Sequence, residues 1–263
     1  MAVDINYVRR GSGEPLVLIH GIGSRWQMWS PVIDALAQHR DVIALDVPGF
    51  GASPRPPQGT KPGIPTMTDM LVEFWQSLGI DRPHVAGNSM GGWLALEMAR
   101  RGVVRSATGL SPAGFHVAPE RAFELASLVV TRTLAKAGRP LAPKAMRTPF
   151  GRKLTLSSLI GKPAQMQPDE AVLSVQGVAD ATWFWPTLGA LCIDRFSGGE
   201  EINVPVTIAW GEHDHLLLPR QAPRALAEIP SARYVLLRDC GHVPAWDNPE
   251  LVTKTILDGS TTA

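Results

Sequence analysis

The sequence predicts an α/β protein with a doubly wound, mostly parallel sheet that is flanked by helices and carries an inserted helical cap. Two observations predict the sheet: short, almost wholly apolar runs recur along the chain, and segments with a helical pattern separate them. A third observation predicts the cap, because one long stretch in the middle of the chain lacks such runs.

The apolar runs are expected to be strands. Leu16–His20 is bounded by Gly-Glu-Pro and Gly-Ile-Gly, and a short apolar run is typical of a strand buried on both faces. Ile5–Arg10 is expected to be an edge strand. Five further runs have the same character as the first: Asp41–Asp46, His84–Gly87, Ser106–Leu110, Pro205–Trp210 and Ala232–Leu237.

Helical patterns lie between these runs. The two late helices each start with a proline at or near the first turn, where the missing N–H is harmless. Strands that alternate with helices indicate βα units and therefore a parallel sheet. The expected helices are Trp26–Ala37, Met67–Leu78, Met90–Arg101, Pro219–Glu228 and Pro249–Leu257.

The stretch from about residue 112 to 199 is helical in character, with many prolines and glycines. A structureless loop of this length is uncommon in a compact domain, so we expect a helical cap over the sheet. The predicted division is a core of residues 1–111 and 200–263 with a cap of residues 112–199. An apolar insertion on an enzyme commonly covers a pocket.

Composition excludes several classes of partner. The formal net charge is +1, and Lys and Arg are expected to be dispersed rather than gathered on one segment, which argues against nucleic acid or an anionic membrane as the main partner. Two cysteines, Cys192 and Cys240, indicate no disulfide framework and a reducing compartment. The first residues do not resemble a signal peptide. A cytoplasmic protein is therefore expected, and a homodimer stays possible.

The strongest chemical signal is the sequence Gly-Asn-Ser-Met-Gly at residues 87–91, which fits G-x-S-x-G between a strand and a helix. Such a sharp turn strains the serine backbone and lifts the Ser89 hydroxyl above the sheet. The helix N-terminus favours negative charge that develops nearby. These residues predict that Ser89 is a nucleophile.

Together with His20-Gly21-Ile22-Gly23 after the first buried strand, this motif makes the chain resemble the α/β-hydrolases over nearly all of its length. The turn at residues 46–53 is similar to the family pattern D-x-P-G-x-G-x-S. The resemblance implies that the backbone N–H groups of Ile22 and Met90 bind the oxyanion of a tetrahedral intermediate.

The acid and the histidine should follow the serine in that order. The resemblance places the acid at Asp214, after the strand Pro205–Trp210, with Glu212 as an alternative and Asp194 as a more remote one. His242 is the candidate base because it follows the last strand, lies beyond the acid and adjoins a glycine. Cys240 is disfavoured as a nucleophile. Its base would be His242, only two positions away, and positions so close on a loop rarely face one another.

The sharp turn at residues 87–91 is the nucleophile elbow of the family. A serine at its centre favours acyl transfer to water, because family members that resemble epoxide hydrolases carry an aspartate there. We therefore expect a serine esterase, similar to carboxylesterases, that cleaves a small, mostly apolar ester-like substrate without cofactor or metal. The runner-up is a carbon–carbon hydrolase, since residues 87–92 resemble the elbow of meta-cleavage-product hydrolases. Their dienoate substrate would need an arginine, for which the insertion offers Arg132, Arg139 and Arg195. A non-catalytic ligand receptor on the same scaffold is the alternative of another class.

Overall fold

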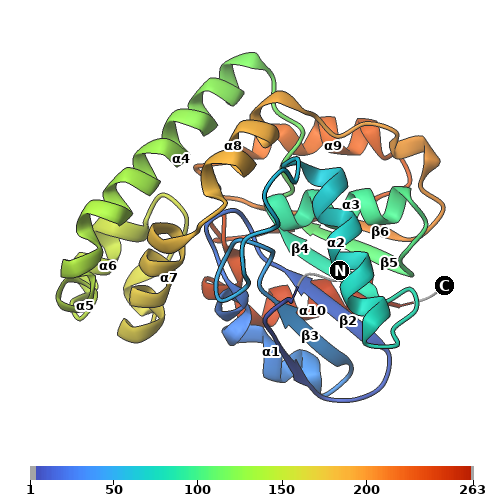
Figure 1. Ribbon diagram of the computed structural model, residues 1–263, viewed down its shortest axis with the longest axis horizontal. Helices are drawn as coiled ribbons and strands as arrows, with labels where there is room; N and C mark the ends of the chain where they lie inside the picture. The colour runs from blue at the N-terminus through green and yellow to red at the C-terminus, as the bar shows by residue number, and fades with distance from the viewer. Residues whose placement is uncertain (1–3, 262–263) are drawn as a thin grey trace.

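The computed structural model describes residues 4–261 and contains one seven-stranded sheet with the strand order β1-β3-β2-β4-β5-β6-β7 (Figure 1). β1 pairs antiparallel with β3, and all other neighbouring strands are parallel. The predicted doubly wound, mostly parallel sheet is thus confirmed. The strands are β1 (Tyr7–Arg10), β2 (Pro15–Ile19), β3 (Asp41–Leu45), β4 (His84–Asn88), β5 (Ser106–Leu110), β6 (Val206–Gly211) and β7 (Arg233–Leu237).

Helices cover both faces of this sheet. On one face α1 (Ser30–Ala37) lies beside α10 (Pro249–Gly259), and both contribute to one apolar core cluster. On the other face α2 (Ile64–Ser77), α3 (Met90–Arg100) and α9 (Ala222–Glu228) contribute to the second cluster.

Strand β2 shows why the apolar runs form this sheet. Leu16 and Leu18 point into the cluster under α1, whereas Val17 and Ile19 point into the cluster under α3. Successive side chains of a strand face opposite sides, so a strand between two helical layers must be apolar at every position. The unbroken run LVLI meets that requirement.

Several elements differ from the expectation. β1 begins at Tyr7, and α1 and α9 begin at Ser30 and Ala222, each after a 3-10 turn. α2 begins at Ile64 rather than Met67, because Pro65 fits the first turn of a helix. β7 is the last strand in the sheet and pairs only with β6, so its Tyr234 and Leu236 are exposed rather than buried. Short 3-10 turns complete the described chain: Trp26–Trp29, Arg139–Leu141, Pro163–Gln165, Gly199–Glu201, Pro219–Gln221 and Pro244–Trp246.

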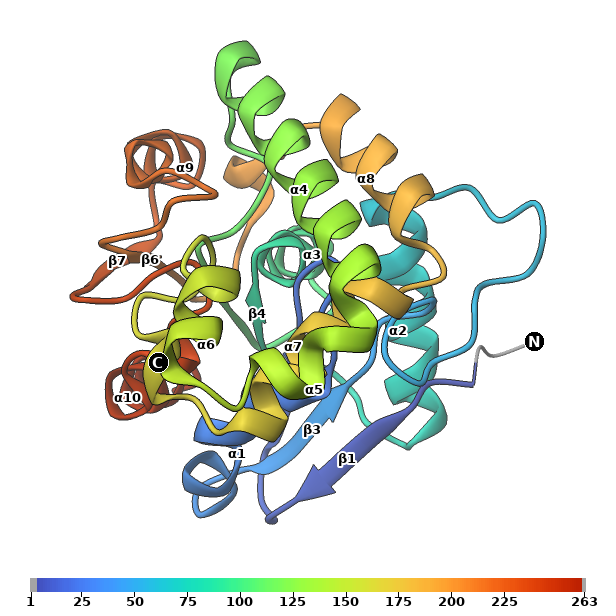
Figure 2. The same cartoon turned by 90° about the vertical axis from the view of Figure 1, so that its left-hand side faces the viewer.

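Between β5 and β6 the chain forms helices only, and we call residues 112–199 the helical insertion. Figures 1 and 2 show it projecting from one end of the sheet, with α4 running along its whole length. α4 packs along α7, and a small apolar cluster around Met146, Leu156 and Val175 holds the shorter helices together. Its helices are α4 (Ala118–Gly138), α5 (Ala142–Ala145), α6 (Pro149–Leu156), α7 (Pro168–Asp180) and α8 (Phe184–Ile193). In residues 4–261 no helix combines the length and the apolar character needed to cross a bilayer.

Candidate active site

Ser89 lies at a strained turn between β4 and α3. Its φ of 57° and ψ of −117° fall in a sparsely populated region, which costs about 1–3 kcal/mol for a residue other than glycine. The glycines around it are required by close packing: a Cβ on Gly87 would lie 2.0 Å from the Gly91 carbonyl oxygen, and one on Gly91 would lie 2.1 Å from the Ile19 carbonyl oxygen. The motif therefore allows helix α3 to start directly against the sheet.

The loop after β2 runs beside this serine. A Cβ on Gly21 would lie 3.1 Å from the Cβ of Ser89, so only a minimal backbone fits there. His20 fixes the loop: its Nδ1 is 2.7 Å from the Gly21 carbonyl oxygen, and its Nε2 accepts from the Val47 N–H at 2.9 Å. Burial lowers the pKa of His20, which keeps the imidazole neutral and suited to donate at Nδ1 while it accepts at Nε2.

The backbone N–H groups of Met90 and Ile22 are the candidate donors for an oxyanion near the serine. Met90 is the first residue of α3, and the first N–H groups of a helix have no intrahelical acceptor. Ile22, in the loop after β2, lines the same cavity as Ser89. Both donors belong to the segments that meet at the turn, and the N-terminal end of α3 favours negative charge there.

Asp214 and His242 are joined by a buried hydrogen bond. The distance from His242 Nδ1 to Asp214 Oδ2 is 2.7 Å, and both side chains are almost fully buried. The other carboxylate oxygen, Oδ1, accepts from the backbone N–H groups of Leu216 and Leu217 at 2.9 Å and 2.8 Å. With its carboxylate held by three donors, Asp214 can fix the orientation and the tautomer of His242.

The alternative acids lie elsewhere. Glu212 is exposed and accepts from the backbone N–H of Asp239, while Asp194 is exposed in a different, polar depression. Glu212, His213 and Asp239 are the described residues that come close enough together to share a metal ion, and all three are exposed. The structure thus brings Asp214, and neither alternative, to the candidate histidine.

Asn88 is a site residue that the sequence does not reveal. Its Nδ2 donates to the His242 carbonyl oxygen at 2.8 Å and to the Leu110 carbonyl oxygen at 3.1 Å. It therefore ties the loop of the histidine to the turn of the serine. Asn88 occupies a variable position of G-x-S-x-G, and its partner is 154 residues away, so no local pattern indicates this contact.

A second carboxylate ties the same loop to the helical insertion. Asp247 is buried and accepts three backbone N–H groups, from Gly241 at 2.8 Å, Gly161 at 2.9 Å and Lys162 at 2.7 Å. The N–H of Val243 also donates to an insertion carbonyl, at Leu159. The position of His242 is thereby coupled to residues 159–162 of the insertion.

Two further ionisable groups are buried near the histidine. Burial raises the pKa of Glu124 on α4 to about 7, although its carboxylate accepts from Gln221 at 2.6 Å. Burial also raises the pKa of the Cys240 thiol to about 12. Cys240 is therefore protonated at neutral pH, which argues against a role as nucleophile.

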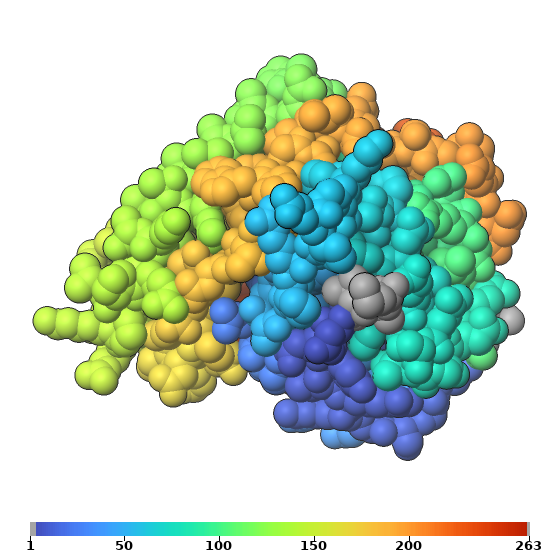
Figure 3. Space-filling model, viewed as in Figure 1, coloured from blue at the N-terminus to red at the C-terminus, as the bar shows by residue number. Residues whose placement is uncertain are grey.

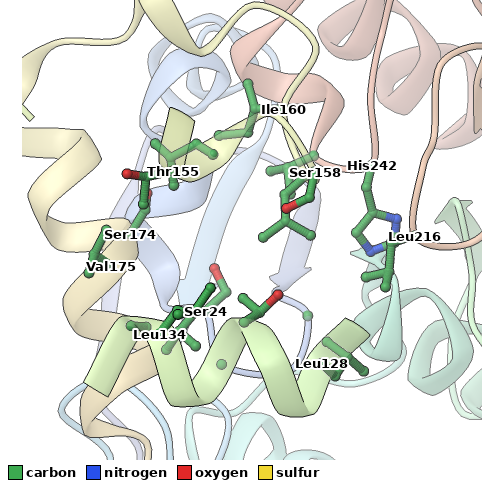
Figure 4. A pocket seen from close by; sticks show the side chains of 18 of the residues that line it. Ser24, Leu128, Leu134, Thr155, Ser158, Ile160, Ser174, Val175, Leu216 and His242 are labelled. Atoms are coloured by element: carbon green, nitrogen blue, oxygen red, sulfur yellow. The ribbon is translucent and has the colours of Figure 1, made fainter. Parts of the chain in front are cut away.

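A cavity of about 670 Å³ joins the sheet end and the helical insertion. Ser89, Ile22 and His242 line its inner end, and the rest is lined mainly by residues 127–178 of the insertion, with Phe184 of α8 and Leu216 among the others. Figure 4 shows His242 and Leu216 at one side, with Ser174 and Val175 at the opposite side and Leu128 and Leu134 along α4. Within residues 4–261, no Asp, Glu, Lys or Arg lines the cavity.

Comparisons with known proteins agree with this architecture. A family model described as the alpha/beta hydrolase fold matches residues 14–249. The epoxide hydrolase EphH of Mycobacterium tuberculosis is 29% identical over 195 residues, which cover 72% of this chain and 91% of that protein. The 2-hydroxy-6-oxo-2,4-heptadienoate hydrolase of Pseudomonas putida is 37% identical over 119 residues, covering 41% of this chain and 43% of its own length.

Among solved structures, that of a bacterial membrane phospholipase A superposes with a TM-score of 0.76 and 26% identity, over 98% of this chain and 84% of the other. The family match spans most of the chain, so the protein belongs to the α/β-hydrolase fold family. It is an enzyme of the hydrolase class, and its relatives include hydrolases of several bond types.

Proposed function

We propose that the protein is a serine hydrolase that cleaves a carboxylic ester-like bond in a small, uncharged, mostly apolar substrate. The observation that carries this proposal is the bond from Asp214 to His242 on a loop that shares one apolar cavity with Ser89. Nucleophile, base and orienting acid are the three parts that this chemistry needs.

In the first half of the reaction the Ser89 oxygen adds to the ester carbonyl carbon while His242 takes the serine proton. Asp214 stabilises the imidazolium that forms. The backbone N–H groups of Ile22 and Met90 bind the oxyanion of the tetrahedral intermediate. The intermediate expels the alcohol, which leaves with the proton from His242, and Ser89 keeps the acyl group as an ester.

In the second half a water molecule gives a proton to His242 and adds to the acyl carbon. The second tetrahedral intermediate then releases the carboxylic acid, and the proton returns to Ser89. No group is consumed, so the three side chains and two N–H donors account for the whole cycle. Residues 112–199 act as a cap that excludes bulk water from these steps, over a core of residues 1–111 and 200–263.

The chemistry of the cavity supports an uncharged substrate. A volume of about 670 Å³ is in the range that encloses a drug-sized ligand, and apolar side chains form most of the wall. Burying an unpaired carboxylate in such a wall would be strongly unfavourable. An acyl group of modest length fits this environment.

The same feature argues against the carbon–carbon hydrolase, whose dienoate carboxylate needs a cation. Arg132 is buried and donates to the carbonyl oxygens of Val178 and Ala181, and Arg139 pairs with Asp180. Arg195 is exposed and outside the cavity. None of the three is available to a substrate beside Ser89.

The first experiment compares the wild type with Ser89→Ala on p-nitrophenyl esters of increasing acyl length. We expect turnover by the wild type and a loss of at least about 10³-fold in kcat/KM for the variant. Turnover that survives in Ser89→Ala would overturn the serine mechanism. A wild type inactive on every ester would overturn the ester assignment.

A fluorophosphonate probe separates an enzyme from a ligand receptor on the same scaffold. An enzyme is expected to be labelled stoichiometrically at Ser89, and the labelling should be lost in His242→Ala because the serine is no longer activated. Equal, slow labelling of both proteins would favour the receptor.

A further inference from the structure

The charges of the protein are unevenly distributed along the chain. Residues 125–168 contain eight of the 25 Lys and Arg residues and none of the 24 Asp and Glu residues. The rest of the chain therefore carries 17 basic and 24 acidic side chains, a formal net charge of −7. The net charge of +1 thus results from a cationic half of the insertion and an anionic remainder.

Only some of these cations have partners in the protein. Arg132 and Arg152 are buried and donate to backbone carbonyl oxygens, and Arg139 pairs with Asp180. The others include four exposed residues that have no carboxylate of residues 4–261 within ion-pair distance: Lys136, Lys144, Arg147 and Lys153.

Large apolar side chains are exposed on the same segment. Leu134, Leu141, Phe150 and Leu154 have 65%, 67%, 75% and 76% of their surface exposed, which is far more than a helix packed only for stability requires. We call residues 134–154 the insertion tip. Figure 1 shows α5 and α6 at the end of the molecule farthest from the sheet, and Figure 3 shows this end protruding.

The insertion tip is also the outer wall of the cavity. Leu134, Leu141 and Leu154 are highly exposed and line the cavity that contains Ser89. The exposed apolar surface is therefore continuous with the apolar cavity. A substrate held at the insertion tip would reach the cavity over apolar side chains.

We propose that the insertion tip docks on an anionic lipid surface. Exposed leucine and phenylalanine side chains beside unpaired lysine and arginine match such a surface, because apolar groups enter the acyl boundary while cations meet the anionic headgroups. The local excess of positive charge orients the protein with its insertion tip toward the lipid. If the proposed ester hydrolysis holds, the substrate enters directly from that surface.

This proposal departs from the expectation of no membrane partner that follows from the whole-chain charge. In the net charge of the whole chain, the acidic residues elsewhere offset the local excess of positive charge on residues 125–168. Attraction to a charged surface falls off within a Debye length of roughly 8–10 Å at physiological salt. The charges at the insertion tip therefore determine the interaction, and the distant carboxylates contribute little.

Vesicle flotation tests the docking without any substrate. The wild type is expected to float with vesicles of phosphatidylcholine and phosphatidylglycerol in equal parts, not with phosphatidylcholine alone, and less at high salt. Phe150→Ser and the triple variant Lys144→Glu/Arg147→Glu/Lys153→Glu should each lower the partition coefficient about tenfold or more. All four side chains are exposed, so the fold should be retained.

Matched controls place the same changes elsewhere on the surface. Ile193→Ser alters a residue as exposed as Phe150, at the far end of α8. Arg55→Glu/Lys61→Glu/Arg238→Glu gives the same net charge as the triple variant from three exposed residues outside the insertion. Both controls should bind vesicles nearly as well as the wild type.

Two outcomes would overturn the proposal. The wild type fails to bind the anionic vesicles, or the control variants lose binding as much as the tip variants do. The wild type could fail to bind vesicles and instead dimerise with increasing protein concentration. If Phe150→Ser abolished that dimerisation, the insertion tip would be assigned to contact with a second copy of the chain.

Hydrolysis of a water-soluble short ester separates this inference from the proposed function. Tip variants that bind vesicles poorly and still hydrolyse the ester at the wild-type rate would support both proposals. A wild type that binds vesicles and hydrolyses no ester would retain the docking surface and refute the esterase.

Discussion

At the scale of single residues, burial decides what each ionisable group can do. Asp214 is buried with three hydrogen-bond donors around its carboxylate, whereas Glu124 is buried with a single short bond to a neutral amide. Burial raises the pKa of Glu124 to about 7, so this carboxyl group holds a proton over a wider pH range than an exposed one. Two carboxyl groups in one region of the protein therefore suit different roles.

Replacing Asp214 by asparagine tests the orienting role. The amide oxygen of Asp214→Asn can still accept from Leu216 and Leu217, but the neutral amide no longer stabilises the imidazolium and favours the wrong tautomer of His242. We expect kcat on a p-nitrophenyl ester to fall by about 10⁴-fold. Glu212→Gln, at the exposed alternative acid, should retain activity. If Glu212→Gln lost activity while Asp214→Asn retained it, the acid would be assigned to Glu212.

Glu124 predicts a pH dependence of stability. Its pKa in the folded protein is about 7, raised by burial from 4.5, so between these values the folded state holds a proton that the unfolded chain releases. This contribution is complete below about pH 4.5 and is lost as the pH rises through about 7. The ionisable groups near it are Glu120, Cys192, Asp214 and the histidines His116 and His242.

Urea unfolding of the wild type and Glu124→Gln measures this effect across about pH 5 to 9, roughly two pH units on either side of the folded-state pKa. The neutral variant should gain about 1–3 kcal/mol relative to the wild type as the pH rises. Glu73→Gln, at an exposed glutamate, should show no such trend. Parallel pH profiles for Glu124→Gln and the wild type would contradict a raised pKa.

At the scale of elements, the site is assembled from four loops that follow strands and from the insertion. β2, β4 and β6 end at the loops of Ile22, Ser89 and Asp214, and parallel strands bring these ends to one edge of the sheet. The loop of His242 follows β7 and is held by side chains from other elements, Asn88 and Asp247. These contacts position the base relative to the serine.

Asp247→Asn tests the coupling between that loop and the insertion. An amide can accept from some of the three N–H groups but presents its own N–H₂ to at least one of them. We expect a loss of about 1–3 kcal/mol in the free energy of unfolding and a fall in kcat larger than any change in KM. Asp239→Asn is the control, because Asp239 is exposed and its φ of 56° suits asparagine. Equal kinetics for Asp247→Asn and the wild type would show that the loop needs no such bond.

At the scale of the whole molecule, the cavity exists because the insertion is placed over the end of the sheet. Its inner end is lined by the candidate catalytic residues Ser89 and His242 and its outer wall is apolar, so we expect the length of the cavity to determine the acyl groups that fit. Val175 on α7 lies across the cavity from His242 (Figure 4). A larger side chain there shortens the space without touching the reacting groups.

Val175→Phe should shift the preferred acyl chain of p-nitrophenyl esters toward shorter lengths. The expected result is a loss of about tenfold or more in kcat/KM for the longest accepted ester, from steric exclusion, with acetate turnover nearly unchanged. A proportional loss on every ester would indicate a damaged fold, and an unchanged profile would place the acyl group elsewhere.

Local patterns in the sequence predict the strands, most of the helices and the sharp turn at Ser89. Unbroken apolar runs such as LVLI predict strands buried on both faces, and the glycines around Ser89 predict a turn that admits no Cβ. These features are local, because strand periodicity and turn chemistry are properties of neighbouring residues. The assignment of Asp214 and His242 as catalytic residues stays a prediction that the geometry supports.

Which residues distant in the sequence come into contact could be seen in the folded structure alone. It selected Asp214 over Glu212 as the partner of His242, and it revealed Asn88 and Asp247 as supports of the histidine loop. It also showed a cavity that no Asp, Glu, Lys or Arg of residues 4–261 lines, and an insertion tip where cations and apolar side chains are exposed together. Hydrogen bonds across 154 residues and the exposure of a side chain depend on how elements pack, and no local pattern encodes either.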